Sequence, residues 1–143
     1  MSFEGPSKVS VEEANTFLKT AFNRPNYHPT VTLMEAGRAV ERLIATEEHL
    51  RPGGYISGPT QMSLADSAAY MAVMTLVGIE PMTVTSNLNI NFLRPCIGAA
   101  LIADARVMKI GQALAVMEVD LRAEGSDKAA SHAVVTYALP RKD

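Results

Sequence analysis

The hydrophobic positions between residues 60 and 78 cover nearly the whole circumference of a helix. They are Met62, Leu64, Ala65, Ala68, Ala69, Tyr70, Met71, Ala72, Val73, Met74, Leu76 and Val77. Ser57 or Gly58 can cap the start of such a helix, Pro59 suits its first helical position, and Gly78 suits its end. A helix that is apolar on every side belongs inside a protein. The pattern therefore predicts a buried central helix.

After Pro81 the hydrophobic pattern changes to a period of two, which is typical of β-strands. Two sets of positions alternate over 84–92: Val84, Ser86, Leu88, Ile90 and Phe92 against Thr85, Asn87, Asn89 and Asn91. Two more strands are expected at 101–108 and 113–121, and a last one at about 129–139. We therefore predict four strands in a meander after the central helix.

The N-terminal part predicts one helix and one strand. Ser10 and Glu13 have the spacing of a capping box. The hydrophobic residues that follow have helical spacing: Val11, Ala14, Leu18 and Phe22. A short helix is therefore expected at about 10–23. The segment 31–48 mixes β-branched residues with Glu and Arg and is expected to be one extended strand, although Met34-Glu35-Ala36 also suits a helix.

This order of elements predicts the fold. One fully apolar helix needs a curved antiparallel sheet around it, since an amphipathic partner helix would cover only one side. The arrangement is that of the hotdog fold, an α+β architecture in which a five- to six-stranded antiparallel sheet wraps around one long central helix. With 143 residues the chain has the size of one domain. We expect this domain to span 1–143, with its core at about 31–140.

Composition narrows the classes of function. The chain is 48% hydrophobic and 20% charged, which is typical of a folded globular domain. A formal net charge of −2 argues against nucleic-acid binding, which needs a surplus of basic residues. The one cysteine, Cys96, excludes an intramolecular disulfide, and the longest apolar stretch, 68–79, is too short to span a bilayer. We expect a soluble, cytoplasmic protein.

Asp66 is out of place among the apolar residues of the central helix. An ionised carboxylate in such surroundings is costly unless it is paired, hydrogen-bonded or solvated. A carboxylate so placed can act as a base or a nucleophile, but it could equally lie on the one wetted face of the helix. Gly58 lies near the helix start, where unpaired N–H groups can hold the oxygen of a polarised carbonyl. Alternatively, this glycine only serves a turn.

Two motifs resemble those of PaaI-like acyl-CoA thioesterases, in the 4-hydroxybenzoyl-CoA thioesterase superfamily. The first is Ser57-Gly58-Pro59-Thr60-Gln61-Met62-Ser63-Leu64-Ala65-Asp66, where the family usually has His-Gly-Gly, a short apolar stretch and Leu-Ala-Asp. The second is Asn89-Ile90-Asn91-Phe92-Leu93-Arg94-Pro95, which is similar to a family strand that ends before Arg-Pro. The similarity runs from about residue 35 to residue 139, in the same order and at the same spacing.

The resemblance implies an acyl-CoA thioesterase that hydrolyses an acyl- or aryl-CoA to CoA and free acid, with no cofactor and no metal. Asp66 matches the catalytic carboxylate, either nucleophile or general base, and Gly58 matches the oxyanion donor. Thr85 falls where some relatives place a hydroxyl that positions the attacking water. In these enzymes that hydroxyl comes from the opposite subunit, so we expect a homodimer or a dimer of dimers. Asn87 is expected on the same strand face as Thr85, where it would share that work.

Two positions depart from the family pattern. Pro59 has no N–H, although the matching glycine, Gly58, is kept. Arg51 stands where some relatives carry Asn or Gln, and it could orient the substrate, pair with Asp66, or remain a solvated loop residue. The residues that we expect to contact the substrate are Arg51, Gln61, Asn87 and Arg94. Basic residues that could meet the CoA phosphates are Arg94, Arg106 and Lys109.

The other reactive residues are weaker candidates, and two further functions stay open. His28, His49 and His132 lack metal-ligand spacing, and Cys96 has no evident partner base. A hotdog hydratase or dehydratase usually needs a paired histidine and acidic residue, and no histidine falls in the helix motif. A non-catalytic acyl-CoA-binding protein, in which Asp66 is structural, would bind CoA esters without turnover.

Overall fold

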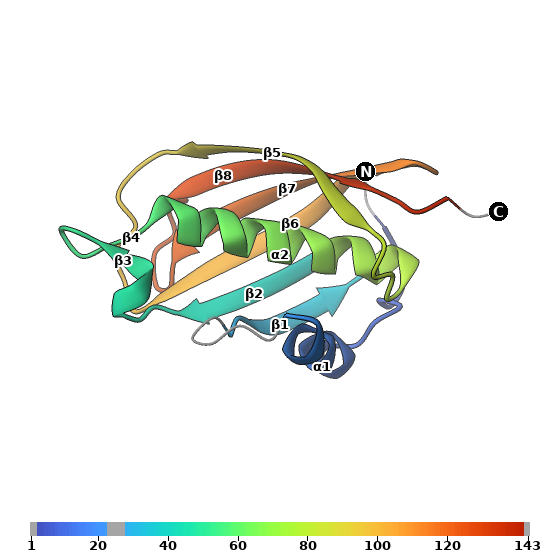
Figure 1. The fold of residues 1–143 in the computed structure, drawn as a ribbon, viewed down its shortest axis with the longest axis horizontal. Coiled ribbons are helices and arrows are strands. Elements are labelled where there is room, and N and C mark those ends of the chain that lie inside the picture. Colours follow the sequence, from blue (N-terminus) through green and yellow to red (C-terminus); the bar gives the residue numbers. More distant parts are fainter. Residues whose placement is uncertain (1–2, 23–27, 142–143) are drawn as a thin grey trace.

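The computed structural model describes residues 3–22 and 28–141. Its elements are α1 (Val11–Ala21), β1 (Thr30–Glu35), β2 (Arg38–Ile44), a 3-10 turn (Glu47–His49), β3 (Leu50–Arg51), β4 (Tyr55–Ile56), α2 (Gly58–Val77), β5 (Val84–Phe92), β6 (Ala100–Ile110), β7 (Leu114–Ala123) and β8 (Ser131–Ala138). Six strands form one antiparallel sheet in the order β1-β2-β6-β7-β8-β5, and β3 and β4 form a separate hairpin. The large sheet curves around α2 (Figure 1), which confirms the predicted hotdog fold.

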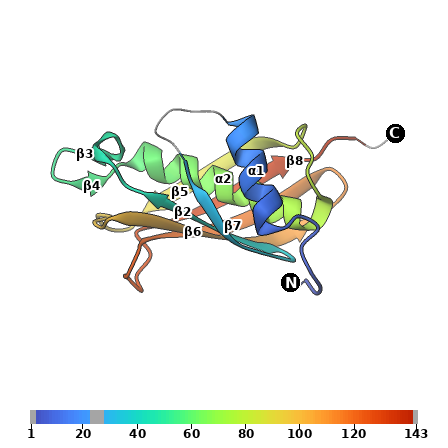
Figure 2. The same ribbon diagram turned by 90° about the horizontal axis from the view of Figure 1, so that it is seen from below.

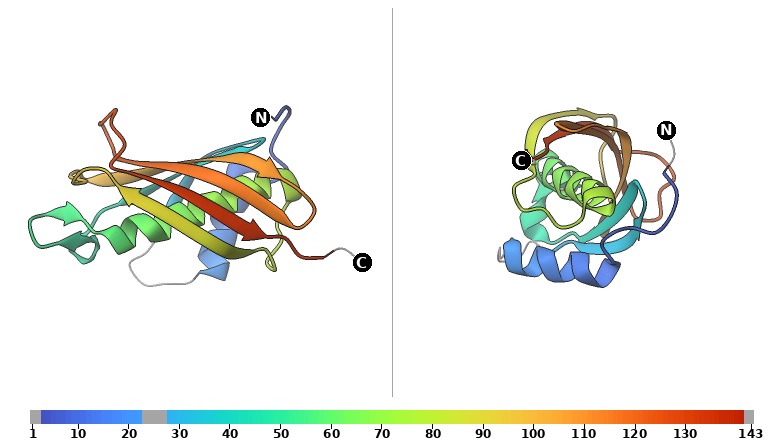
Figure 3. Two further views of the ribbon diagram at one scale, coloured as in Figure 1. Left: turned by 90° about the horizontal axis from the view of Figure 1, so that it is seen from above. Right: turned by 90° about the vertical axis from the view of Figure 1, so that its right-hand side faces the viewer.

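The central helix α2 lies in the concave face of the sheet, as the end-on view in Figure 3 shows. Ser57 caps its start, because its hydroxyl accepts a hydrogen bond from the Thr60 N–H. Gly78 ends it with φ +84°, a conformation that residues with a Cβ rarely adopt. The predicted buried helix is therefore confirmed at both ends. Among the described residues, no helix has the length and apolar character that crossing a membrane requires.

The N-terminal helix α1 lies beside β1 and runs across the direction of α2 (Figure 2). Ser10 and Glu13 form the predicted capping box at its start. The Asn15 side chain holds α1 against the sheet, because its amide oxygen accepts from the Val31 N–H at 2.8 Å and its amide nitrogen donates to the Val31 carbonyl at 3.0 Å. The Phe17 ring meets Tyr70 of α2 edge-on, with 5.9 Å between ring centroids.

The prediction of one strand over 31–48 is wrong, because this segment contains two strands and a 3-10 turn. β1 and β2 pair as a hairpin whose turn includes Gly37 at φ +80°. The Gly37 N–H donates to the Thr75 hydroxyl of α2 at 2.9 Å, which fixes the hairpin against the central helix. The β-branched residues on both sides of Gly37 fit one continuous strand, but the chain reverses direction at this glycine.

The predicted meander is correct for β6, β7 and β8 but wrong for β5. Within the part of the chain that the structure describes, β5 pairs only with β8 and is an edge of the sheet, whereas β6 pairs with β2 and β7. Residues 93–99 carry the chain from that edge to the middle of the sheet. The Cys96 carbonyl in this connection accepts a hydrogen bond from the Ile56 N–H of β4, at 2.8 Å. β5 therefore keeps one side unpaired.

Candidate active site

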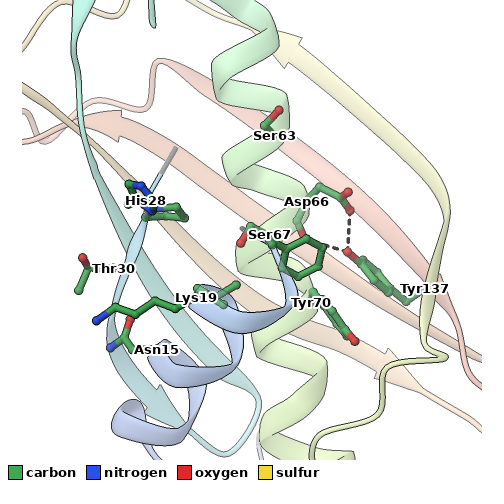
Figure 4. Close-up of a pocket in the computed structure, with 12 residues that line it drawn as sticks. Asn15, Lys19, His28, Thr30, Ser63, Asp66, Ser67, Tyr70 and Tyr137 are labelled. Carbon is green, nitrogen blue, oxygen red and sulfur yellow. Dashed lines mark hydrogen bonds between the residues drawn. The ribbon is translucent and has the colours of Figure 1, made fainter. Parts of the chain in front are cut away.

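Asp66 extends from α2 toward β5 and β8, where two hydroxyl groups hold one of its carboxylate oxygens. The Thr85 hydroxyl of β5 donates to Oδ1 at 2.7 Å, and the Tyr137 hydroxyl of β8 lies 2.7 Å from the same atom. The Tyr137 hydroxyl also lies 2.9 Å from the backbone carbonyl oxygen of Asp66 (Figure 4). Oδ2 accepts no hydrogen bond from the described residues. The half-buried carboxylate is thus held through one oxygen and leaves the other for a ligand.

Thr85 reaches Asp66 because β5 contains a bulge at Ser86. Thr85 lies opposite Tyr137 of β8, but Asn87 lies opposite Thr136, so Ser86 is an extra residue in the strand. A bulge of this kind reverses the alternation of side chains that follows it. Because cross-strand partners share a face, Thr85 and Tyr137 both face the helix.

The same bulge places Asn87 on the outer face of the sheet. Leu88 and Ile90, which follow it, pack against the core. Strict alternation then directs Asn87 away from α2, so the prediction that it shares the strand face of Thr85 is wrong. Val84 shows the same reversal at the start of the strand. Strict alternation grouped it with Leu88 and Ile90, but 53% of Val84 is exposed.

The source of the Thr85 hydroxyl also differs from the expectation. We expected this group to meet the carboxylate from the opposite subunit, but the Thr85 and Asp66 of one chain are already in contact. The carboxylate and its hydroxyl partner are therefore assembled without a second copy.

Tyr137 was not among the predicted site residues. Burial and the neighbouring charge of Asp66 raise the pKa of its hydroxyl above the usual range, so it stays protonated and can donate to the carboxylate. Its ring stacks on Tyr70 with 5.4 Å between centroids, and the Tyr70 hydroxyl donates to the Glu80 carbonyl at 2.9 Å. The alternation of β8, in which Ala133 and Val135 are buried, placed Tyr137 on the inner face, but only the fold brings it to Asp66.

A cavity of about 400 Å³ opens beside Asp66, between α1 and α2. Its lining combines apolar and polar side chains (Figure 4): Asn15, Leu18, Lys19, Phe22, His28, Pro29, Thr30, Ser63, Asp66, Ser67, Tyr70 and Tyr137. The residues from α1 and the segment after it form one wall, and the middle of α2 forms the other. We call this space the Asp66 cavity.

A second cavity, of about 580 Å³, lies at the start of α2. It is lined by Arg51, Tyr55, Ile56, Gly58, Pro59, Gln61, Phe92, Leu93, Arg94, Pro95 and Cys96. Four predicted site residues thus come together here, namely Gly58, Arg51, Gln61 and Arg94. We call this space the Gly58 cavity. The expectation that Arg51 could pair with Asp66 is not met, because Arg51 lies in this cavity and not in the one beside Asp66.

The two cavities are separated along the same helix. Gly58 and Asp66 are eight residues apart, so the helical rise places them about 12 Å apart along the axis. The Gly58 N–H donates to no acceptor among the described residues. A Cβ added at Gly58 would lie 3.1 Å from the Phe92 ring, so glycine leaves just enough space at this helix start. One thioester carbonyl cannot contact both residues of a single chain.

The other residues of the Gly58 cavity have different surroundings. Gln61 is buried, and its side chain donates to the Ile56 carbonyl at 3.1 Å and accepts from the Ser131 hydroxyl at 2.6 Å. These bonds give Gln61 a structural role that the sequence did not indicate. Arg94 is exposed and donates to the Ala129 carbonyl. Arg51 is exposed and enters no ion pair among the described residues.

The remaining reactive candidates lie outside this arrangement. Burial raises the pKa of the Cys96 thiol, which disfavours its nucleophilic form. Arg106 lies 3.8 Å from Asp104 and is exposed on the sheet. Over residues 3–22 and 28–141, no three His, Cys, Asp or Glu side chains are grouped so that they could hold a metal ion.

Comparisons with known proteins agree with this architecture. The family model for the thioesterase superfamily matches residues 53–130, which include Gly58, Asp66 and Thr85. A protein from Saccharolobus solfataricus named as an esterase is 30% identical over 108 residues, which make up 76% of each chain. A solved structure from Silicibacter sp. TM1040, named as a thioesterase, has a TM-score of 0.87 and 30% identity, over 98% of this chain and 99% of its own. The PaaI protein of Escherichia coli, from the phenylacetic acid degradation operon, shares the fold with a TM-score of 0.72 at 23% identity, over 90% and 92% of the two chains.

Proposed function

The chain belongs to the thioesterase superfamily, and we propose that it hydrolyses an acyl- or aryl-CoA thioester to CoA and a carboxylic acid at sites built by two copies of the chain. The observation that carries this proposal is the Asp66 carboxylate, held by Thr85 and Tyr137 through one oxygen and open at the other. This carboxylate borders a cavity large enough for an acyl group.

The chemistry requires a nucleophile at the thioester carbon. Oδ2 of Asp66 either attacks that carbon or removes a proton from a water that attacks it. The new C–O bond forms as negative charge develops on the carbonyl oxygen. Collapse of that intermediate breaks the C–S bond. If Asp66 activated a water, the acid is released and the CoA thiolate takes up the proton that Asp66 removed. If Asp66 attacked directly, a water then hydrolyses the acyl–Asp66 anhydride, which frees the carboxylate, releases the acid and supplies the proton for CoA. The hydroxyls of Thr85 and Tyr137 fix the carboxylate so that Oδ2 is directed at the reacting centre.

The developing oxyanion needs a donor, and the Gly58 N–H fits this role. It is unpaired, it lies at a helix start, and the helix dipole favours negative charge there. Because Gly58 of the same chain is about 12 Å from Asp66, we propose that the donor at each site belongs to a second copy. The active unit is then a homodimer with two equivalent sites.

The edge strand β5 offers the surface for this pairing. One of its sides has no strand partner among residues 3–22 and 28–141, and an unpaired strand edge is a template for another chain. Large apolar side chains at both ends of the strand are more than half exposed in the single chain, namely Val84, Phe92 and Leu93. Antiparallel pairing of two β5 strands would place two α2 helices side by side in opposite directions. The start of one helix would then approach the middle of the other.

The Gly58 cavity suits the CoA part of the substrate. Arg51 and Arg94 both line it, and guanidinium groups are natural partners of phosphates. The Phe92 ring lines the same space, next to Gly58. In the dimer, a substrate would extend from the arginines of one copy, past Gly58, to the Asp66 cavity of the other copy.

The test is release of free thiol from a panel of aliphatic and aromatic acyl-CoAs. Asp66→Asn should lower turnover at least about 100-fold, as expected for loss of a positioned acid–base group. Asp120→Asn is the matched control, because Asp120 is exposed on β7 and lies outside both cavities. Equal rates in the wild type and Asp66→Asn would contradict the proposal. Binding of CoA esters without turnover would instead indicate a non-catalytic acyl-CoA-binding protein.

A further inference from the structure

Glu41 is a carboxyl group in the middle of the hydrophobic core. It lies in β2, and its exposed fraction is 0%. Its cross-strand neighbours are Val31 of β1 and Ala103 of β6, neither of which titrates. The alternation of β2 directs Ala39, Glu41 and Leu43 toward α2, so an acid occupies a core position. Buried acids without a partner are costly, which makes this one unusual.

The partner of Glu41 is Ser67 of α2. The Ser67 hydroxyl lies 2.9 Å from one carboxyl oxygen of Glu41 and 3.0 Å from the other. Burial raises the pKa of Glu41 to about 8, and the charge of Asp66 acts in the same direction, while the bond from Ser67 opposes them. At neutral pH Glu41 therefore carries a proton. The charge that acts on Glu41 is that of Asp66, the residue before Ser67 on α2, although the Asp66 side chain extends toward β5 and β8.

Ser67 connects this acid to the active site. It follows Asp66 directly on α2, and both residues line the Asp66 cavity. β5 and β8 hold Asp66 through Thr85 and Tyr137, whereas β2 holds Ser67 through Glu41. One turn of the helix is thus fixed from opposite sides of the curved sheet.

We propose that Glu41 is a positioning residue, which holds the Ser67 hydroxyl and so fixes the turn of α2 that carries Asp66. This role rests on the proposed thioesterase function of Asp66. The protonated acid gives Ser67 a hydrogen-bond partner without adding charge to the site. The total negative charge before reaction is then that of Asp66 alone.

The neutrality of Glu41 matters for the reaction itself. Attack on a thioester creates negative charge close to Asp66, in a site partly shielded from water. A second fixed carboxylate in the same low-dielectric region would disfavour that charge. The rate should therefore fall as Glu41 ionises in alkaline solution, even though the fold stays intact.

Two variants separate the hydrogen bond from the charge. Glu41→Gln is neutral and keeps an acceptor for Ser67, so it should keep kcat within about 3-fold at pH 7 and should not lose activity between pH 7 and 9. The wild type should lose activity over that range. Glu41→Met keeps the length of the side chain without hydrogen bonding. It should lower kcat about 10- to 100-fold through misplacement of Asp66. The melting temperature should change little, because Ser67 borders the Asp66 cavity, where a water can replace its lost partner.

The outcomes distinguish this role from the proposed function. The positioning role would be overturned if Glu41→Met kept the kcat of the wild type while Asp66→Asn was inactive. It would also be overturned if Glu41→Gln lost activity between pH 7 and 9 to the same extent as the wild type. A wild type that hydrolyses no acyl-CoA would overturn both the function and the role. The protonation state of Glu41 can be measured without an activity assay, from the infrared difference spectrum between the wild type and Glu41→Gln. A protonated carboxyl band is expected at pH 7, and its absence would contradict a neutral Glu41.

Discussion

The Tyr137 hydroxyl lies 2.7 Å from Oδ1 of Asp66, on the same oxygen that Thr85 binds. This contact joins residues 71 positions apart in the chain. It exists because β8 and α2 are packed face to face, with the Tyr137 ring stacked on Tyr70. Together with the Thr85 hydroxyl, the Tyr137 hydroxyl holds the carboxylate that the proposed reaction needs.

Tyr137→Phe should lower kcat about 10-fold or more, since a hydrogen bond to a charged group contributes about 1.5–3 kcal/mol. The ring and its stacking remain, so the melting temperature should change little. Tyr70→Phe is the matched control, because the Tyr70 hydroxyl binds the Glu80 carbonyl and not Asp66. Steady-state kinetics of both variants on one acyl-CoA decide the matter, and equal kcat values for the two would contradict a role for Tyr137.

Thr85→Val should also reduce turnover about 10-fold or more, because it removes the other hydroxyl on Oδ1 with little change in volume. Thr85→Ser keeps the hydroxyl and should restore most of the rate. Asn87→Ala serves as a control on the outer face of the same strand, and it should leave kcat unchanged. A larger loss in Asn87→Ala than in Thr85→Val would be incompatible with the bulge at Ser86.

Mixing two inactive variants tests whether each site draws on two chains. Gly58→Ala places a methyl group against the Phe92 ring and crowds the proposed oxyanion donor, so it should be impaired, as should Asp66→Asn. If each site combines Gly58 of one copy with Asp66 of the other, mixed dimers have one intact site of two. Random exchange should then restore about one quarter of wild-type activity, because about half of the dimers are mixed. No recovery after confirmed subunit exchange would place both groups at the same site of one chain.

Glu41 should make stability depend on pH. Its folded pKa of about 8 lies above the value of 4.5 expected in the unfolded chain, so the folded state binds the extra proton between these values. The unfolding free energy should therefore be highest near pH 4.5, relative to Glu41→Gln, and fall as the pH rises to about 8. The difference should reach several kcal/mol, at about 1.4 kcal/mol for each pKa unit. Urea unfolding at pH 5, 6, 7 and 8 measures it, and parallel curves for the two proteins would contradict a buried neutral Glu41.

The central helix and its site residues could be predicted because their signals are local. An apolar stretch bounded by Ser57 and Gly78 indicates the helix by itself. An aspartate inside that stretch is a candidate functional residue even when the fold is unknown. Motif spacing then led to Gly58. Gly58 and Asp66 do lie on the expected helix, but their assignment to different cavities follows from helix length and from the loops around them.

The strand residues were harder to predict, because one extra residue in a strand moves every following side chain to the opposite face of the sheet. Strict alternation grouped Thr85 with Asn87, and the bulge at Ser86 separates them. The amino-acid sequence around Ser86 does not distinguish a bulged strand from a regular one. Tyr137 and Glu41 were missed for a different reason, since each gains its role only from contacts with α2 that are remote in sequence.

The two walls of the Asp66 cavity have unequal freedom to vary. The wall that carries the carboxylate belongs to the buried helix and is fixed by the surrounding strands, whereas the facing wall comes from α1. Asn15 fastens that helix to the backbone of Val31, and Leu18 joins the core. Lys19 borders the same cavity but is exposed and is not part of that core. Substitutions at Lys19 can therefore reshape what fits beside Asp66 while the reacting group stays in place. The exposed part of this wall can therefore change in size and charge without any change in the residues that hold Asp66.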